Sequence, residues 1–374
     1  MNGNLRVGSL FGIPFYVNLS WFLVLALVTW NYSGGLAAAF PALGGSLPWL
    51  LGLVTALLLF ASVVAHELGH SFAARRQGIG VNSITLFLFG GLAALEKEST
   101  TPKGAFWVAI SGPLVSFALF ALFALTNIVL PLTGPLAAIV TVLSYINLAL
   151  GVFNLIPGLP LDGGNVLKAI VWRITGNPYK GTIFASRFGQ VIGWVAIALG
   201  VGSFVGLTPF GSFWNALIGL FLVQNASRSA QSAEVQSRLE GLTAEDAILE
   251  NSPIISADLT LRALADEMVL KSNGTWRKFL VVNADEQLVG TLQVDTLRQV
   301  SCDRWSETLV SDVMDSPDSL ATVESDQSLL DVVKLLEQKK LHSLPVLDKN
   351  GVLVGLLEKA SILAMLQRPA ANPA

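Results

Sequence analysis

The chain contains very little cysteine, histidine or charge. Among its 374 residues there are one cysteine, Cys302, and three histidines, and charged residues make up 13%. A single cysteine excludes a disulfide framework within the chain and suits a reducing compartment. The scarcity of charge, a hydrophobic share of 52% and a mean hydropathy of +0.61 argue against an ordinary soluble protein and indicate an integral membrane protein.

Charge is missing altogether from three long blocks, Val7–His66, Gly104–Leu161 and Phe188–Ser227. A helix that crosses a bilayer needs about 20 residues, so each block can hold two spans joined by a short turn. We therefore predict an α-helical integral membrane domain with six spans. The spans are Phe15–Trp30, Trp49–Ala65 with its continuation through 66–70, Ala105–Val129, Leu136–Asn154, Gly189–Val205 and Phe213–Asn225.

The few charges of this region are mostly positive. Up to Asn225 there are 9 Lys and Arg against 4 Asp and Glu, whereas from Ala226 onward there are 14 against 22. All nine basic residues precede the first span or lie in the connections that follow the second and fourth spans, on one side of the membrane. The positive-inside rule assigns that side to the cytoplasm. We expect a multi-pass protein whose two termini and acidic soluble part are cytoplasmic.

Two of the three histidines lie in one pentapeptide, His66-Glu67-Leu68-Gly69-His70. On a helix, His66 and His70 are one turn apart on the same face and can hold one metal ion. Glu67 follows the first histidine directly, where a carboxylate can act as base on a metal-bound water. A pattern this short also occurs by chance, so its surroundings decide its meaning.

The fourth predicted span ends in a helix-breaking stretch, 154–164, that contains two prolines and Asp162. Asp162 is the only acidic residue between Glu98 and Glu234, and a carboxylate at the edge of a bilayer is costly enough to indicate function. It could instead cap the helix that follows. The second and fourth spans run toward the same side, so Asp162 lies at the depth of the two histidines. Two histidines, one carboxylate and an open fourth position are typical of a catalytic zinc site.

The segment Val81–Leu95 is apolar but too short to cross the bilayer. Its β-branched and aromatic residues predict a short hairpin or re-entrant segment, and a surface loop with an apolar face is the alternative. The small residues and proline of Ser111-Gly112-Pro113 permit close helix packing or a kink.

These motifs resemble those of the site-2 protease family of intramembrane zinc metalloproteases. The resemblance rests on the pentapeptide 66–70 and on the Asn-x-x-Pro-x-x-Pro-Leu-Asp-Gly-Gly pattern at 154–164, and covers roughly residues 5–227. Phe-Gly-Gly at 89–91 and the Ser-Gly-Pro at 111–113 also fit. The resemblance implies one Zn²⁺ per chain. It implies His66, His70 and Asp162 as ligands, Glu67 as the catalytic base, and Asn154 as a group that holds the substrate or the oxyanion.

The acidic C-terminal part contains an internal repeat with a period of roughly 65 residues, seen when 279–292 is aligned with 343–357. It resembles a pair of cystathionine-β-synthase-type (CBS) repeats, which implies a soluble α/β domain. We therefore predict a membrane domain at 1–227, a linker at 228–241 and a tandem CBS domain at 242–374. The repeats are about 242–305 and 306–368.

Many CBS pairs bind adenine nucleotides through a Gly-x-x-Thr/Ser-x-x-Asp pattern after the second strand. This chain has Gln293 and Thr296 in the first repeat, and Glu358 and Ser361 in the second, while Asp295 is one residue out of register. The departure argues against conventional adenine nucleotide binding. A structural pair, or one that forms a homodimer, is at least as well supported.

The leading hypothesis is hydrolysis of a peptide bond within a transmembrane segment of another membrane protein, most simply a single-pass one, with the CBS pair as a candidate regulator. We expect the lipid bilayer as the environment and no nucleic-acid partner. The alternatives are a CBS-regulated channel or transporter and an inactive protease homologue. Against the transporter, the ionisable residues inside the spans belong to one metal constellation and form no translocation path.

Overall fold

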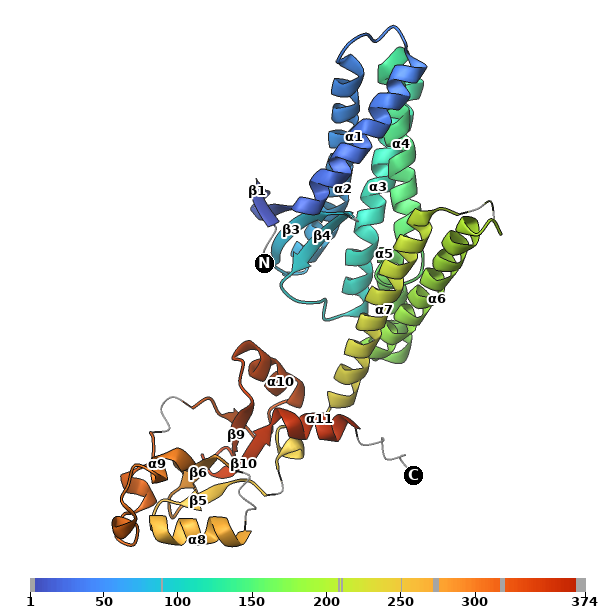
Figure 1. Cartoon of the computed structure of the whole chain (residues 1–374). Helices are drawn as coiled ribbons and strands as arrows, with labels where there is room; N and C mark the ends of the chain where they lie inside the picture. The colour runs from blue at the N-terminus through green and yellow to red at the C-terminus, as the bar shows by residue number, and fades with distance from the viewer. Residues whose placement is uncertain are drawn as a thin grey trace. The chain divides into compact units, whose positions relative to one another are not determined.

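The computed structural model describes residues 4–367, with the exception of 89, 208, 210, 250, 272–275 and 317–319. The chain divides into two compact units, Met1–Glu234 and Val235–Ala374. The first unit is built of long helices and one sheet, and the second unit is a smaller α/β structure (Figure 1).

Within the described residues of the first unit, five helices are long and apolar enough to cross a membrane. They are α1 (Leu19–Ala39), α2 (Leu47–Arg75), α3 (Pro102–Val129), α4 (Gly134–Asn154) and α6 (Pro178–Phe204). Helix α5 (Asp162–Thr175) is short, and helix α7 (Phe213–Leu239) begins where the sixth span was expected but is not among the five. Helix α7 continues past Asn225 and makes the predicted linker, 228–241, helical as far as Leu239.

The prediction for the first span was wrong at both ends. Strand β2 (Ile13–Asn18) occupies its expected start, and α1 begins only after Asn18, whose side chain accepts the N–H of Ser20. The helix then continues through Ser33, Gly34 and Gly35 to Ala39. There the Ser33 hydroxyl donates to Thr29 O, and Ser33 packs against Gly52 of α2, so tertiary packing overrides the weak helix propensity of the small residues.

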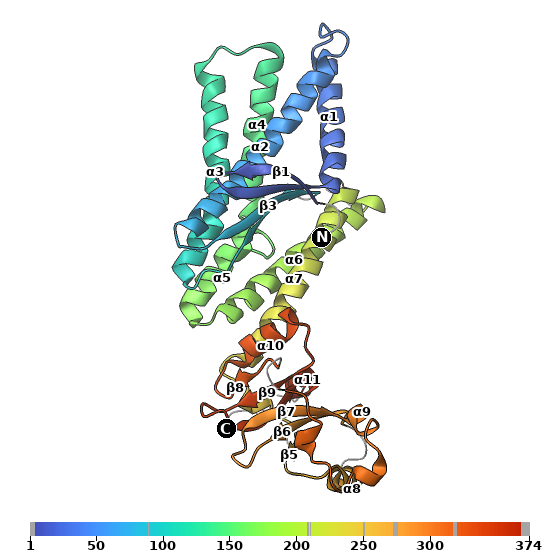
Figure 2. The same cartoon turned by 90° about the vertical axis from the view of Figure 1, so that its left-hand side faces the viewer.

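The segment Val81–Leu95 forms a hairpin, as predicted, of β3 (Val81–Phe87) and β4 (Gly90–Leu95). It belongs to a sheet of order β1-β2-β3-β4, which adds β2 and β1 (Asn4–Leu10). Strand β2 pairs parallel with β3, and the other neighbours are antiparallel. The sheet lies beside α2 (Figure 2). Its edge strand β4 packs against that helix.

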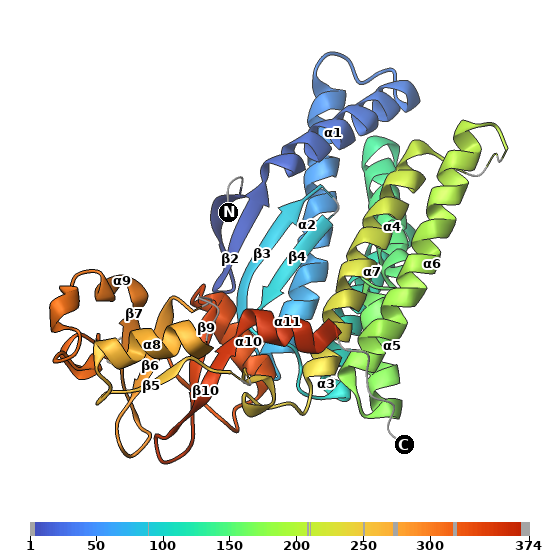
Figure 3. The same cartoon turned by 60° about the horizontal axis from the view of Figure 1, so that its bottom comes forward.

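Helix α2 is the centre of the first unit, since it contacts α1, α3, α4 and the sheet. Small residues allow these elements to approach closely, as where Gly69 lies against the carbonyl of Ser111 on α3. The Asn147 side chain of α4 donates a buried hydrogen bond to Ser62 of α2 (3.1 Å). These contacts hold the helix of the pentapeptide against α3 and α4, which also pack on each other (Figure 3).

The second unit contains two three-stranded sheets of the same topology. In each sheet the first strand is parallel to the second, and the second is antiparallel to the third. The first consists of β5 (Ile254–Ser256), β6 (Lys278–Val282) and β7 (Leu288–Gln293), with α8 (Leu261–Lys271) and α9 (Val294–Leu297). The second consists of β8 (Val323–Glu324), β9 (Ser343–Leu347) and β10 (Leu353–Glu358), with α10 (Leu329–Gln338) and α11 (Lys359–Gln367).

Each sheet of the second unit has its own buried core, and a third cluster formed by Leu280, Leu353 and Leu356 joins the two. The α/β character and the internal repeat expected from the sequence are therefore present in the structure. The pairing of the repeats buries apolar surface that one repeat alone would leave in water.

Candidate active site

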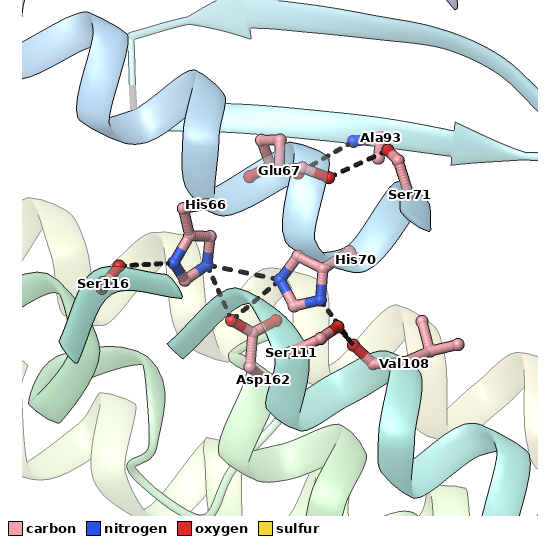
Figure 4. Close-up of polar contacts among 9 residues, drawn as sticks. All are labelled: His66, Glu67, His70, Ser71, Ala93, Val108, Ser111, Ser116 and Asp162. Atoms are coloured by element: carbon pink, nitrogen blue, oxygen red, sulfur yellow. Dashed lines mark hydrogen bonds and ion pairs between the residues drawn. The ribbon is translucent and has the colours of Figure 1, made fainter. Parts of the chain in front are cut away.

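The pentapeptide lies in the C-terminal half of α2, and its two histidine rings point toward Asp162, the first residue of α5 (Figure 4). Asp162 Oδ2 lies 3.0 Å from Nε2 of His66 and 3.2 Å from Nε2 of His70, and the two Nε2 atoms are 3.3 Å apart. The edges of a tetrahedral zinc site measure about 3.3 Å. The structure thus brings the three predicted ligands together at the spacing that zinc requires.

The histidine tautomer supports the same conclusion. A carbonyl oxygen only accepts hydrogen bonds, so Nδ1 of His70 carries the proton that it donates to Val108 O (2.7 Å). In the neutral form of this ring, Nε2 carries the lone pair, and it faces the point that Asp162 Oδ2 and His66 Nε2 also face. Nδ1 of His66 lies 2.9 Å from Ser116 Oγ, which fixes the second ring. A metal ion satisfies all three acceptors at once, so the residues fit the zinc that the sequence implied.

The loop that carries Asp162 is fixed against α6. The N–H of Leu159 donates to the carbonyl of Ala185 (3.1 Å), and Gly158 and Gly189 allow the two backbones to approach. The loop then turns into α5 with Asp162 in its first turn. The sequence Pro-x-x-Pro therefore ends α4 and delivers a carboxylate to the histidines.

Glu67 points away from the histidine pair toward the edge strand (Figure 4). The Ala93 N–H of β4 donates to Glu67 Oε2 (3.1 Å), and Gly91 of the same strand packs on the side chain. The carboxylate is thus buried beside the ligand cluster and held by backbone, free of a direct bond to the two histidines. Its role as a general base stays a prediction.

A cleft of about 600 Å³ opens on this cluster. Its wall includes strand β4, the end of α4 with Asn154, and parts of α2, α3, α5 and α7. Asn154 lines the cleft, and its role stays a prediction. The polar residues of the wall are His66, Glu67, His70, Glu98, Ser99, Asn154, Asp162, Asn165, Lys168 and Asn225.

Several residues of this site could not be identified from the sequence. Gly112 lies against both ligand nitrogens, so the Ser-Gly-Pro motif gives the metal site its space as well as allowing helix packing. Phe221 and Asn225 bring α7 to the cleft, and Lys168 pairs with Glu98 across it. Only the Ser-Gly-Pro motif gave a local signal; the others depend on contacts between distant segments.

The geometry and the donor set define a candidate metal site in a unit with apolar helices of membrane length. Comparison with known families agrees. Residues 54–136 and 130–198 match the model of peptidase family M50, and residues 310–368 match that of the CBS domain.

Relatives extend the match over nearly the whole chain. A Synechocystis protein named as a zinc metalloprotease is 57% identical over 371 residues, which is 99% of this chain and 97% of its own length. Rip3 of Mycobacterium tuberculosis, also named as a zinc metalloprotease, is 33% identical over 94% of this chain and 90% of its own. The site-2 protease structure from Methanocaldococcus jannaschii is 28% identical, covers 61% of this chain and 95% of its own, and gives a TM-score of 0.44. The chain belongs to peptidase family M50, the site-2 proteases, and carries a CBS domain.

Gly91 offers a test of how β4 positions the base. A methyl group at this position would lie 2.5 Å from Cγ and 2.9 Å from Oε1 of Glu67. We expect Gly91→Ala to displace the carboxylate and lower kcat by about 10²-fold, while the zinc content stays that of the wild type. Peptide hydrolysis and metal analysis measure the two quantities. Gly44→Ala is the control, since a methyl there meets nothing within 4 Å; unchanged kcat in Gly91→Ala would contradict the positioning.

Proposed function

We propose that the protein is an intramembrane zinc endopeptidase that cleaves a transmembrane segment of another membrane protein, most simply a single-pass one. The observation that carries the proposal is the convergence of three ligand atoms, 3.0–3.3 Å apart, two of which belong to a helix long enough to span the bilayer. A buried carboxylate and an edge strand border the same cleft. A channel or transporter does not require a metal site beside a buried carboxylate and an edge strand.

The topology that we propose has six spans, with the apolar first half of α7 as the sixth. An even number of spans brings both termini and the second unit to one side. The charge distribution supports that side as the cytoplasm, because the nine basic residues up to Asn225 all fall there. The pentapeptide and Asp162 then lie near the cytoplasmic side of the bilayer.

One zinc ion per chain would be held by His66, His70 and Asp162. When bound, zinc supplies a Lewis acid that polarises a carbonyl group and activates water. Ser116 and the carbonyl of Val108 orient the two histidine rings through their second nitrogens. The buried surroundings exclude bulk water and keep the ligands in one geometry.

Glu67 is the proton carrier in the proposed reaction. Its Oε2 is occupied by the Ala93 N–H, which leaves Oε1 to accept a proton from the attacking water and to return it to the leaving amine. Asn154, on the cleft wall, is placed to donate its amide N–H groups to the substrate or the oxyanion.

The substrate must unwind locally before it can react, because a helix locks its carbonyl groups in hydrogen bonds. The free edge of β4 can pair with an extended segment and replace the lost bonds. Strand β4 lines the cleft from Gly90 to Ala93, and its far side is covered by β3. The sheet thus provides a rigid support for an otherwise unstable extended chain.

The CBS pair is a candidate regulator and a candidate homodimer contact. The hydroxyl of Ser361, at the Thr/Ser position of the nucleotide pattern, lies 2.8 Å from the carbonyl oxygen of Ala247 and 2.7 Å from that of Glu358. It is therefore engaged within the domain. This supports the view from the sequence that conventional adenine nucleotide binding is doubtful.

The proposal is tested with the full-length protein in detergent micelles and a synthetic single-span peptide whose apolar helix is interrupted by Gly-Pro. We expect cleavage within the apolar segment, loss of cleavage after chelation, and recovery when one zinc per chain is restored. Mass spectrometry locates the cut and metal analysis gives the stoichiometry. Cleavage that continued after all metal had been removed would contradict the proposal.

A further inference from the structure

Lys168 of α5 lies in the wall of the active-site cleft, six residues after Asp162. Its ammonium group is 2.6 Å from Oε2 of Glu98, which belongs to the segment between β4 and α3. Among the described residues that line the cleft, Lys168 is the only lysine or arginine. The wall of the cleft therefore contains an ion pair whose ammonium group the proposed hydrolysis does not use.

The two partners of this ion pair differ sharply in exposure. The Lys168 side chain is 13% exposed, whereas that of Glu98 is 84% exposed. An ion pair with one partner in water contributes little to stability, so Glu98 can leave at small cost. Lys168 stays, because its stem is packed in the wall of the cleft, and it then needs another anion.

We propose that Lys168 determines specificity by binding a carboxylate of the substrate, an aspartate or glutamate that flanks the scissile bond on the cytoplasmic side. In the free protein the Glu98 carboxylate binds Lys168, and the substrate carboxylate displaces it. The inference rests on the proposed function and adds a class of substrate to it. Lys168 is not a catalytic residue here; it contacts a flanking side chain.

Repulsion contributes as much to this selection as attraction. Membrane helices usually carry Lys or Arg at their cytoplasmic ends. In a partly buried cleft a second ammonium group next to Lys168 is unfavourable, so most helices in the membrane are rejected at this point. A helix with an acidic flank escapes the repulsion and gains a charge-assisted hydrogen bond.

The test uses three families of single-span peptides that are identical except for one residue, Asp, Asn or Lys, placed in turn at each position of the cytoplasmic flank. We expect a position at which Asp raises kcat/KM over Asn by about tenfold, and at which Lys lowers it. Lys168→Gln removes the preference, and Lys168→Glu reverses it. Binding of the same peptides to the Glu67→Gln variant, by fluorescence anisotropy, gives the same order without turnover.

Two further variants distinguish binding of an acidic side chain from a simple latch, in which the Lys168–Glu98 pair closes the cleft to every substrate alike. Glu98→Gln removes the competing carboxylate, so it should tighten binding of the Asp peptide and leave the Asn peptide unchanged; an equal gain for all three peptides would overturn the inference in favour of a latch. Lys180→Gln, a basic residue at the start of α6 outside the cleft, is the control and should keep the preference. A flat Asp:Asn:Lys ratio at every position also overturns it, while cleavage of the Asn peptide still supports the proposed function.

Discussion

Glu67→Gln should lower kcat by about 10³-fold while the protein keeps its zinc. Glutamine has the shape of glutamate, and its carbonyl oxygen can still accept the N–H of Ala93, so the local structure is preserved. It cannot take a proton from water at neutral pH. Because His66, His70 and Asp162 are untouched, metal binding is unaffected.

The measurement combines single-turnover hydrolysis of the single-span peptide with metal analysis of the same sample. Glu96→Gln is the matched control, since Glu96 is an exposed carboxylate directly after β4 that does not line the cleft. It should retain wild-type activity. Hydrolysis by Glu67→Gln within a few fold of the wild-type rate, with zinc present, would remove Glu67 from the role of base.

Gly112→Ala should abolish zinc binding and, with it, activity. The added methyl would lie 2.6 Å from Cε1 of His70 and 2.8 Å from Nε2 of His66, closer than carbon and these ring atoms can approach. Since α3 is held by its packing against α2, the rings must give way, and the three acceptors no longer meet at one point. The expected zinc content is that of His66→Ala, which lacks a ligand outright.

Zinc titration and circular dichroism distinguish this effect from general unfolding. The helical content should remain, because α3 already contains Gly112 in helical conformation and alanine favours a helix over glycine. Gly34→Ala, in α1, meets nothing within 4 Å and should keep both metal and activity. Stoichiometric zinc in folded Gly112→Ala would show that the rings have more room than the contacts indicate.

The ligand set could be predicted from the sequence because charge is so rare in the first 225 residues. His66, His70 and Asp162 stand out in apolar surroundings, and the direction of the spans gives them a common depth. The structure brings them within 3.3 Å of one another. In a membrane protein the few polar residues at bilayer depth are therefore strong candidates for functional residues, because each one is costly to bury there.

The apolar composition that identified the spans also concealed the N-terminal strand β2. Ile13–Asn18 is apolar and adjoins α1, so composition alone merges it with the first span. Its partner β3 lies more than 60 residues away, and no local periodicity reports a parallel pairing at that separation. The Lys168–Glu98 pair could not be predicted either, because it joins helix α5 to the segment between β4 and α3, which meet only in the folded unit.

The hydrogen bond from Ala93 to Glu67 has one more consequence. An N–H group serves one acceptor well, and this one lies on the edge that an extended substrate would use. A strand that paired with β4 at Ala93 would compete with Glu67 Oε2 for this donor, while Oε1 would stay available in both states. Pairing of a substrate along β4 and the hydrogen bonding of Glu67 are therefore coupled.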